Sequence, residues 1–173
     1  AIIDSKELAI IGNVDSQNLS IIDLKINEVI NTIKIDTAPL GLTSNPSGEE
    51  VFITSWFKSQ VLVLSTKDFS VTKAFNVGAT PSGIAFNKKY NFIVITSRDA
   101  NLVEIYNATD YSLQKKIKVG SHPYGISTSD KFIYVANVYD DTISIINIFN
   151  WEQKVIKVGL HPYNVISYKD KAY

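Results

Sequence analysis

The chain contains no cysteine and no methionine, and only one of its 17 basic residues is an arginine. Without cysteine it cannot form a disulfide, a zinc–thiolate site or a cysteine nucleophile. The single arginine, Arg98, leaves little capacity for bidentate recognition of phosphate or guanine. Because 17 acidic residues balance the 17 basic ones, the net charge predicts neither a nucleic-acid partner nor an anionic membrane partner.

Long apolar runs are also missing, since no stretch reaches the ~18 residues that a membrane-spanning helix needs. Hydrophobic residues make up 45% of the chain and charged residues 20%, which is typical of a globular domain. The 173 residues suffice for one domain with a sizeable core. Because methionine is absent even from position 1, we expect that part of the translated sequence, including any signal peptide, has been removed.

The chain does contain an internal repeat, marked by four prolines that are spaced 42, 42 and 39 residues apart. The prolines are Pro39, Pro81, Pro123 and Pro162. A glycine follows two residues after each of the first three, at Gly41, Gly83 and Gly125. Proline fixes φ and glycine accepts positive φ, so the pattern predicts the same turn at the same position in each repeat. Alternatively, each glycine admits a close neighbour that leaves no room for a side chain.

Two further motifs recur with the same period. The first is Ile10-Ile11-Gly12-Asn13, Phe52-Ile53-Thr54-Ser55, Val94-Ile95-Thr96-Ser97 and Tyr134-Val135-Ala136-Asn137. The second is "NLSIID", "QVLVLS", "LVEIYN" and "TISIIN", each beginning five residues after the first motif ends. β-Branched and aromatic residues dominate, so each copy predicts four short strands; in the fourth copy these lie near 124–128, 132–138, 142–148 and 153–158.

Apolar residues occupy both faces of these strands, which indicates sheets packed between neighbouring sheets. The sequence therefore predicts an all-β fold, a β-propeller of four-stranded antiparallel blades with about four repeats of ~40 residues. The expected blades are about 1–39, 40–81, 82–123 and 124–162, and 163–173 begins another blade. Both ends of the chain fall on the same inner strand, so we expect further blades or a second chain to complete the ring.

The motifs resemble those of the YVTN family of β-propeller repeats. The resemblance rests on Tyr134-Val135-Ala136-Asn137, on the strand Asn18–Asp23 and on Val119-Gly120-Ser121-His122-Pro123, and it covers essentially the whole chain. It implies a radial propeller, most often seven-bladed, in extracytoplasmic proteins that are periplasmic, secreted or on the cell surface. It implies little about activity.

Candidate functional residues are few. The only two histidines, His122 and His161, directly precede two of the repeat prolines, where the other copies carry Ala38 and Thr80. A turn position in the repeat is one interpretation, and a ligand or metal site at the mouth of the channel is the other. Trp56 and Phe57 form an apolar pair in one loop, and could contact a partner or pack against the next blade.

Other polar motifs have weaker support. Asp140 and Asp141 could contribute to a calcium site, but the spacing lacks the D-x-D-x-D-G pattern and favours a solvated hairpin. Two N-x-S/T sequons, at Asn18 and Asn107, would be glycosylated only in an exported protein. No G-x-S-x-G, P-loop or G-x-G-x-x-G motif is present.

Two classes of function follow. The first is a non-catalytic binding or scaffold module, without a cofactor, whose rigid loops present a surface to a protein or small-molecule ligand. The alternative is an enzymatic or redox propeller resembling the haem d1 or copper reductases, or a lactonase. For that alternative only His122 and His161 could match the haem or copper ligands, and two histidines are too few for a multi-copper cluster.

Overall fold

The computed structural model describes residues 1–173 and is built from β-strands, with a short 3-10 helix at Asp4–Lys6 as its only helix. The chain divides into two compact units, Ala1–Val77 and Gly78–Tyr173, and each is described by itself. It has no helix that is long and apolar enough to cross a membrane. The predicted fold class is confirmed, because the chain forms four four-stranded antiparallel sheets.

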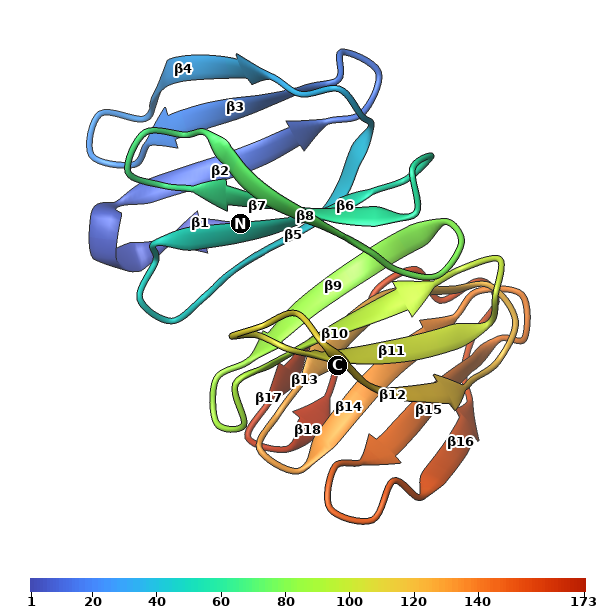
Figure 1. The fold of residues 1–173 in the computed structure, drawn as a ribbon. Helices are drawn as coiled ribbons and strands as arrows, with labels where there is room; N and C mark the ends of the chain where they lie inside the picture. The colour runs from blue at the N-terminus through green and yellow to red at the C-terminus, as the bar shows by residue number, and fades with distance from the viewer. The chain divides into compact units, whose positions relative to one another are not determined.

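The first unit consists of two sheets layered face to face (Figure 1). One contains β1 (Ile2–Ile3), β2 (Leu8–Asn13), β3 (Asn18–Asp23) and β4 (Glu28–Lys34). The other contains β5 (Pro39–Ser44), β6 (Glu50–Ser55), β7 (Gln60–Ser65) and β8 (Val71–Asn76). The core between them is aliphatic and brings Ile10 and Ile21 of the first sheet together with Ile53 of the second.

The second unit repeats this arrangement and adds a hairpin (Figure 1). One sheet contains β9 (Pro81–Asn87), β10 (Phe92–Ser97), β11 (Leu102–Asn107) and β12 (Leu113–Lys118). The other contains β13 (Pro123–Thr128), β14 (Phe132–Asn137), β15 (Thr142–Asn147) and β16 (Gln153–Lys157). The hairpin pairs β17 (Ser167–Tyr168) with β18 (Lys171–Ala172). Every residue of β10 is buried, as the prediction of strands with two apolar faces requires.

The repeat glycines lie inside strands and not in turns, so the predicted positive φ at Gly41, Gly83 and Gly125 is wrong. The positive-φ residue is instead the one before the proline, with φ of +54° at Thr80, +52° at His122 and +51° at His161. The first copy differs, because Ala38 has no positive φ.

Close approach explains the glycines in the second unit. A Cβ on Gly125 would lie 2.5 Å from the Cα of Asn164 and 2.6 Å from the carbonyl oxygen of Tyr163. A Cβ on Gly83 would collide with the carbonyl oxygen of Tyr124 in the same way. Because these neighbours are backbone atoms, in β13 for Gly83 and in the segment 163–164 for Gly125, no side chain can move aside to make room.

The threonine of the strand motif explains why it recurs together with these glycines. The hydroxyl of Thr96 accepts the N–H of Gly83 at 2.7 Å and donates to the carbonyl of Tyr124 at 2.7 Å. Thr54 accepts the N–H of Gly41 at 2.7 Å in the preceding copy. The motif therefore satisfies a backbone donor that the strand pairing leaves free.

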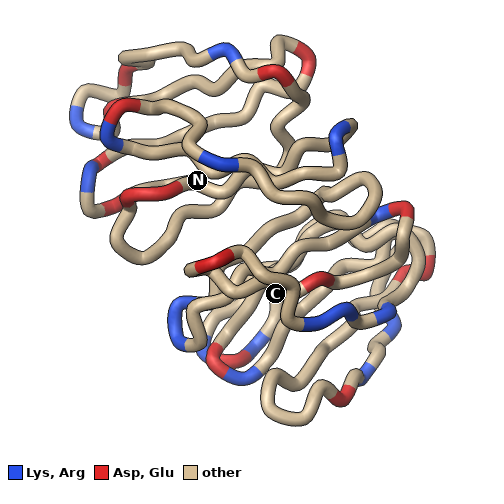
Figure 2. Tube along the Cα trace, in the orientation of Figure 1, with Lys and Arg blue, Asp and Glu red and all other residues tan.

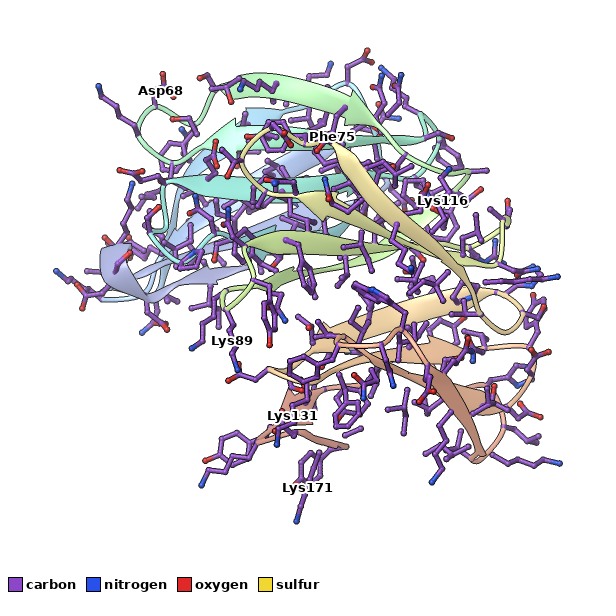
Figure 3. The ribbon with its side chains drawn as sticks, turned by 60° about the horizontal axis from the view of Figure 1, so that its bottom comes forward. Asp68, Phe75, Lys89, Lys116, Lys131 and Lys171 are labelled. Atoms are coloured by element: carbon purple, nitrogen blue, oxygen red, sulfur yellow. The ribbon has the colours of Figure 1, made fainter.

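The turn that enters β9 is held by a buried carboxylate. Glu104 on β11 has a fully buried side chain that accepts hydrogen bonds from the N–H of Gly78 at 2.5 Å and the hydroxyl of Ser97 at 2.7 Å. Nζ of Lys116, on the outer strand β12 and labelled in Figure 3, lies 2.8 Å from Oε1, the other carboxylate oxygen of Glu104. Burial alone would raise the pKa of Glu104, but the hydrogen bonds from Lys116, Ser97 and Gly78 outweigh it and hold the pKa below its usual value.

Substitution of the glycines tests the close approach. We expect Gly83→Ala and Gly125→Ala each to lower the free energy of unfolding by about 1–3 kcal/mol, because the added methyl group overpacks against backbone. Gly159→Ala is the matched control, since a Cβ there meets no atom within 4 Å. Urea unfolding midpoints measure the effect. Equal midpoints for Gly125→Ala and Gly159→Ala would show that the strands separate at no cost.

Titration tests the buried carboxylate. A carboxylate with a lowered pKa in the folded state stabilises the fold above its unfolded pKa of about 4.3, and this contribution is lost as the pH falls through the folded pKa. We therefore expect Glu104→Gln to destabilise the protein by about 1–3 kcal/mol at pH 7, with a smaller difference from wild type in acid. Exposed Glu152→Gln serves as the control in the same urea titrations. A Glu104→Gln deficit that does not change with pH would contradict the assignment.

Candidate functional site

Both histidines lie at one end of the second unit, on turns that the repeat places side by side. His122 directly precedes β13, and His161 follows β16 in the corresponding turn of the next copy. His122 is half-buried and His161 is exposed. Both have positive φ, a conformation that histidine tolerates better than β-branched residues do.

The ring of Tyr139, in the turn between β14 and β15, contacts both histidines. Its centroid lies 4.0 Å from that of His122, with an interplanar angle of 33°, and 6.1 Å from that of His161, in an edge-on arrangement at 83°. Tyr139 remains 58% exposed. The histidines thus flank an aromatic ring, and no three His, Asp or Glu side chains are grouped so that they could hold a metal ion.

A second aromatic pair lies two residues after each histidine in the sequence. Tyr124 and Tyr163 meet edge to face, with their centroids 5.2 Å apart. Burial raises the pKa of Tyr124, and the nearby Tyr163 hydroxyl adds to this, so Tyr124 stays neutral at physiological pH. We refer to His122, Tyr139, His161, Tyr124 and Tyr163 together as the aromatic turn face.

Polar groups fix the backbone beneath this face. The N–H of His122 donates to the side-chain oxygen of Asn101 at 2.9 Å, and the N–H of His161 donates to Asp141 at 2.9 Å. Asp140 accepts the N–H of Ser121 at 2.6 Å. The two aspartates that the sequence offered as calcium ligands therefore accept hydrogen bonds from turn amides, which hold the turn backbone in place within the chain itself.

The same turns bring one serine to a histidine. The hydroxyl of Ser121 lies 3.0 Å from Nδ1 of His122, the distance of a nucleophile from its base. However, Asp140 is bonded to the backbone N–H of Ser121 and not to the imidazole. A catalytic triad requires the acid to orient the ring of the base, so Ser121, His122 and Asp140 do not have the geometry of a triad.

Trp56 and Phe57 occupy the corresponding turn in the first unit. Trp56 is half-buried, Phe57 is 77% exposed, and their rings meet at 6.3 Å. Phe57 aligns with Tyr139 in the repeat, and both are exposed. Sequence reasoning singled out Phe57 but missed Tyr139, although their equivalent positions in the loop were the signal that could have found it.

The opposite end of the second unit carries ion pairs between successive hairpins. Lys89 lies 3.4 Å from Asp130, and Lys131 lies 3.0 Å from Asp170; both lysines are labelled in Figure 3 at this end. These pairs are exposed and contribute little each.

One apolar face in this unit is partly uncovered. A cavity of about 680 Å³ lies on the sheet of β13–β16, beside the hairpin β17–β18. Phe132, Tyr134 and Ile156 line it. The hydroxyl of Tyr134 donates to the carbonyl of Asp170 at 2.6 Å, which attaches the hairpin to one side of this face.

Comparison with known proteins gives a fold but no family. No family model matches the chain, and no curated protein sequence matches it. Solved structures do. U3-55K superposes with a TM-score of 0.86 at 11% identity, over 95% of this chain and 53% of its own.

Two further structures extend this likeness. The WD40 repeats of RRP9 give a TM-score of 0.81 at 12% identity, over 91% of this chain and 49% of theirs. A catalytically inactive virginiamycin B lyase from Staphylococcus aureus, with quinupristin, gives 0.80 at 18% identity, over 94% and 57%. The chain thus spans about half the length of these proteins. At such identities the likeness shows the fold alone, and the fold is that of β-propeller blades.

Proposed function

We propose that the chain is a non-catalytic binding module, a β-propeller of the YVTN type, that recognises its partner through the aromatic turn face. The exposed ring of Tyr139 between His122 and His161 carries this proposal. Exposed aromatic residues on rigid turns supply large contact areas at low entropic cost, and they are enriched among the residues that dominate binding energy. The turn amides bonded to Asn101 and Asp141 support it, because a preformed surface loses little freedom on binding.

Further blades, most often seven in all for the family that the motifs resemble, or a second chain, complete the ring in this proposal. The support is the apolar face with its 680 Å³ cavity beside β17–β18, because uncovered apolar faces of this kind mark interaction sites. An extracytoplasmic location, periplasmic, secreted or on the cell surface, rests on the same resemblance. The partner is a protein or a small molecule.

An enzymatic role is the second candidate. One observation favours it, namely the 3.0 Å contact between the hydroxyl of Ser121 and Nδ1 of His122. A lyase is also among the structures with similar blades. In an enzyme or redox propeller, His122 and His161 would provide the base or the haem or copper ligands.

Substitution on the aromatic turn face tests the leading proposal. We expect peptides or soluble glycans selected on arrays with the wild-type protein to bind Tyr139→Ala at least ~10-fold more weakly, since a central tyrosine commonly contributes more than 1 kcal/mol. Phe149→Ala is the matched control, because Phe149 is similarly exposed, at 64%, and belongs to another turn. Titration calorimetry measures both. The proposal would be contradicted if Phe149→Ala lowered the affinity for the selected ligand and Tyr139→Ala did not.

Spectroscopy separates the two candidates. We expect the purified protein to show no stoichiometric haem or copper in its visible absorption spectrum and metal analysis, because the ring of Tyr139 contacts both histidines and no three His, Asp or Glu side chains are grouped to hold a metal ion. Bound haem or copper that is lost on His122→Ala or His161→Ala would overturn the non-catalytic proposal and establish the redox alternative.

A further inference from the structure

The strand β4 (Glu28–Lys34) forms an open edge of the first sheet, whose order is β1-β2-β3-β4. All of its side chains except that of Ile33 are exposed. Val29 is 58% exposed and Ile30 is 50% exposed, and the preceding turn adds Ile26. An edge strand offers unpaired N–H and C=O groups to any extended chain, and exposed apolar side chains make such pairing favourable.

The other outer strands carry the charges that normally protect a sheet edge. Their lysines are Lys73 on β8, Lys115, Lys116 and Lys118 on β12, and Lys154 and Lys157 on β16. By contrast, β4 has only Lys34, at its last position. Figure 2 shows it as an uncharged segment between an acidic start and a basic end. β4 is therefore the only one of the four outer strands that has no charged residue between its first and last positions.

The sequence of β4, "EVINTIK", is complementary to itself in the antiparallel direction. When two copies pair about Asn31, Glu28 of each copy lies opposite Lys34 of the other. Val29 then lies opposite Ile33, and Ile30 lies opposite Thr32. Directly opposite side chains in an antiparallel pair have Cβ atoms about 4.5–5.5 Å apart, so opposite charges and apolar pairs both stabilise this register.

The same pairing about the strand centre gives no pair of opposite charges in the two outer strands with several lysines, β12 and β16. In β12 it would place Lys115 opposite Lys116, a contact between like charges. In β16 it would place Lys154 opposite Ile156 and Gln153 opposite Lys157. Only β4 matches an acidic residue with a basic one at both ends, so the complementarity is not a general property of outer strands in this repeat.

A bulge in β4 does not remove this distinction. The register with β3 shifts between Ile21 and Ile22, which leaves Ile30 as an extra residue. Bulges also discourage edge pairing, but β8 and β12 contain one at the corresponding place. In the self-paired arrangement the bend at Ile30 lies opposite Thr32 in both copies, and Asn31–Lys34 keeps a regular ladder with β3.

We propose that the chain forms a symmetric homodimer in which the β4 strands of two copies pair antiparallel about Asn31. The contact is isologous, so the same patch of each copy serves both sides and the assembly closes at two chains. It joins the two four-stranded sheets into one continuous sheet. This assembly is independent of the aromatic turn face.

Charge reversal tests the pairing and its register. Light scattering after size exclusion should give twice the 19.2 kDa chain mass at high protein concentration. Glu28→Lys and Lys34→Glu should each raise the dissociation constant of the dimer at least tenfold, because each creates like-charge pairs at both ends. The double variant exchanges the charges and should restore the dimer. Lys154→Glu on β16 is the matched control and should have no effect.

Crosslinking tests the symmetry axis, and the absence of cysteine makes it unambiguous. Asn31 faces itself across the axis at a Cα separation of about 4.5–5.5 Å, which suits a disulfide. Mild oxidation should therefore link Asn31→Cys into a covalent dimer, and should leave Val155→Cys on β16 monomeric. The proposal is wrong if the chain is monomeric at all concentrations, if the double charge variant fails to recover the dimer, or if Asn31→Cys does not crosslink.

Discussion

The inner strands of successive sheets in the second unit lie so close that one hydroxyl group joins them. Thr96 accepts the N–H of Gly83 and donates to the carbonyl of Tyr124 in the next sheet, and this is possible because Gly83 has no Cβ to occupy the space. Ser82 adds a hydrogen bond to the carbonyl of Pro123 at 3.0 Å. The turns at this end of the unit are positioned by these contacts, and so is every side chain that the turns carry.

The repeat therefore fixes the positions of the turns. The side chains that take no part in these backbone contacts determine what the turns can bind. Asn101 and Asp141 hold the amides of His122 and His161 in equivalent ways, which makes the backbone of the two turns nearly interchangeable. The ring of Tyr139 is not part of that framework. Since it is exposed and contacts both imidazoles, it is the part of this surface that the architecture does not require.

The strands could be predicted from the sequence because three motifs at a fixed spacing constrain one another, and those of the fourth copy agree with the structure to within one or two residues. The reason for the glycines could not be predicted with the same certainty. A positive φ and a close neighbour both exclude side chains, and only coordinates distinguish Gly125 from a turn residue. The repeat alignment marks Tyr139 as the counterpart of Phe57, but its contact with the two histidines could not be predicted, because that contact depends on how turns from different copies meet.

The contact between successive inner strands does not require the threonine that Thr96 represents in the third repeat. In the fourth repeat Ala136 stands where Thr96 stands in the third, and the N–H of Gly125 reaches the carbonyl of Tyr163 directly, at 3.0 Å. The contact between neighbouring repeats can therefore be made by a side-chain donor, as with Thr96, or by a backbone donor, as with Gly125. Substitution of the motif threonine is then tolerated. The backbone geometry can then persist while the sequence changes, and the chain superposes on known propellers at only 11–18% identity.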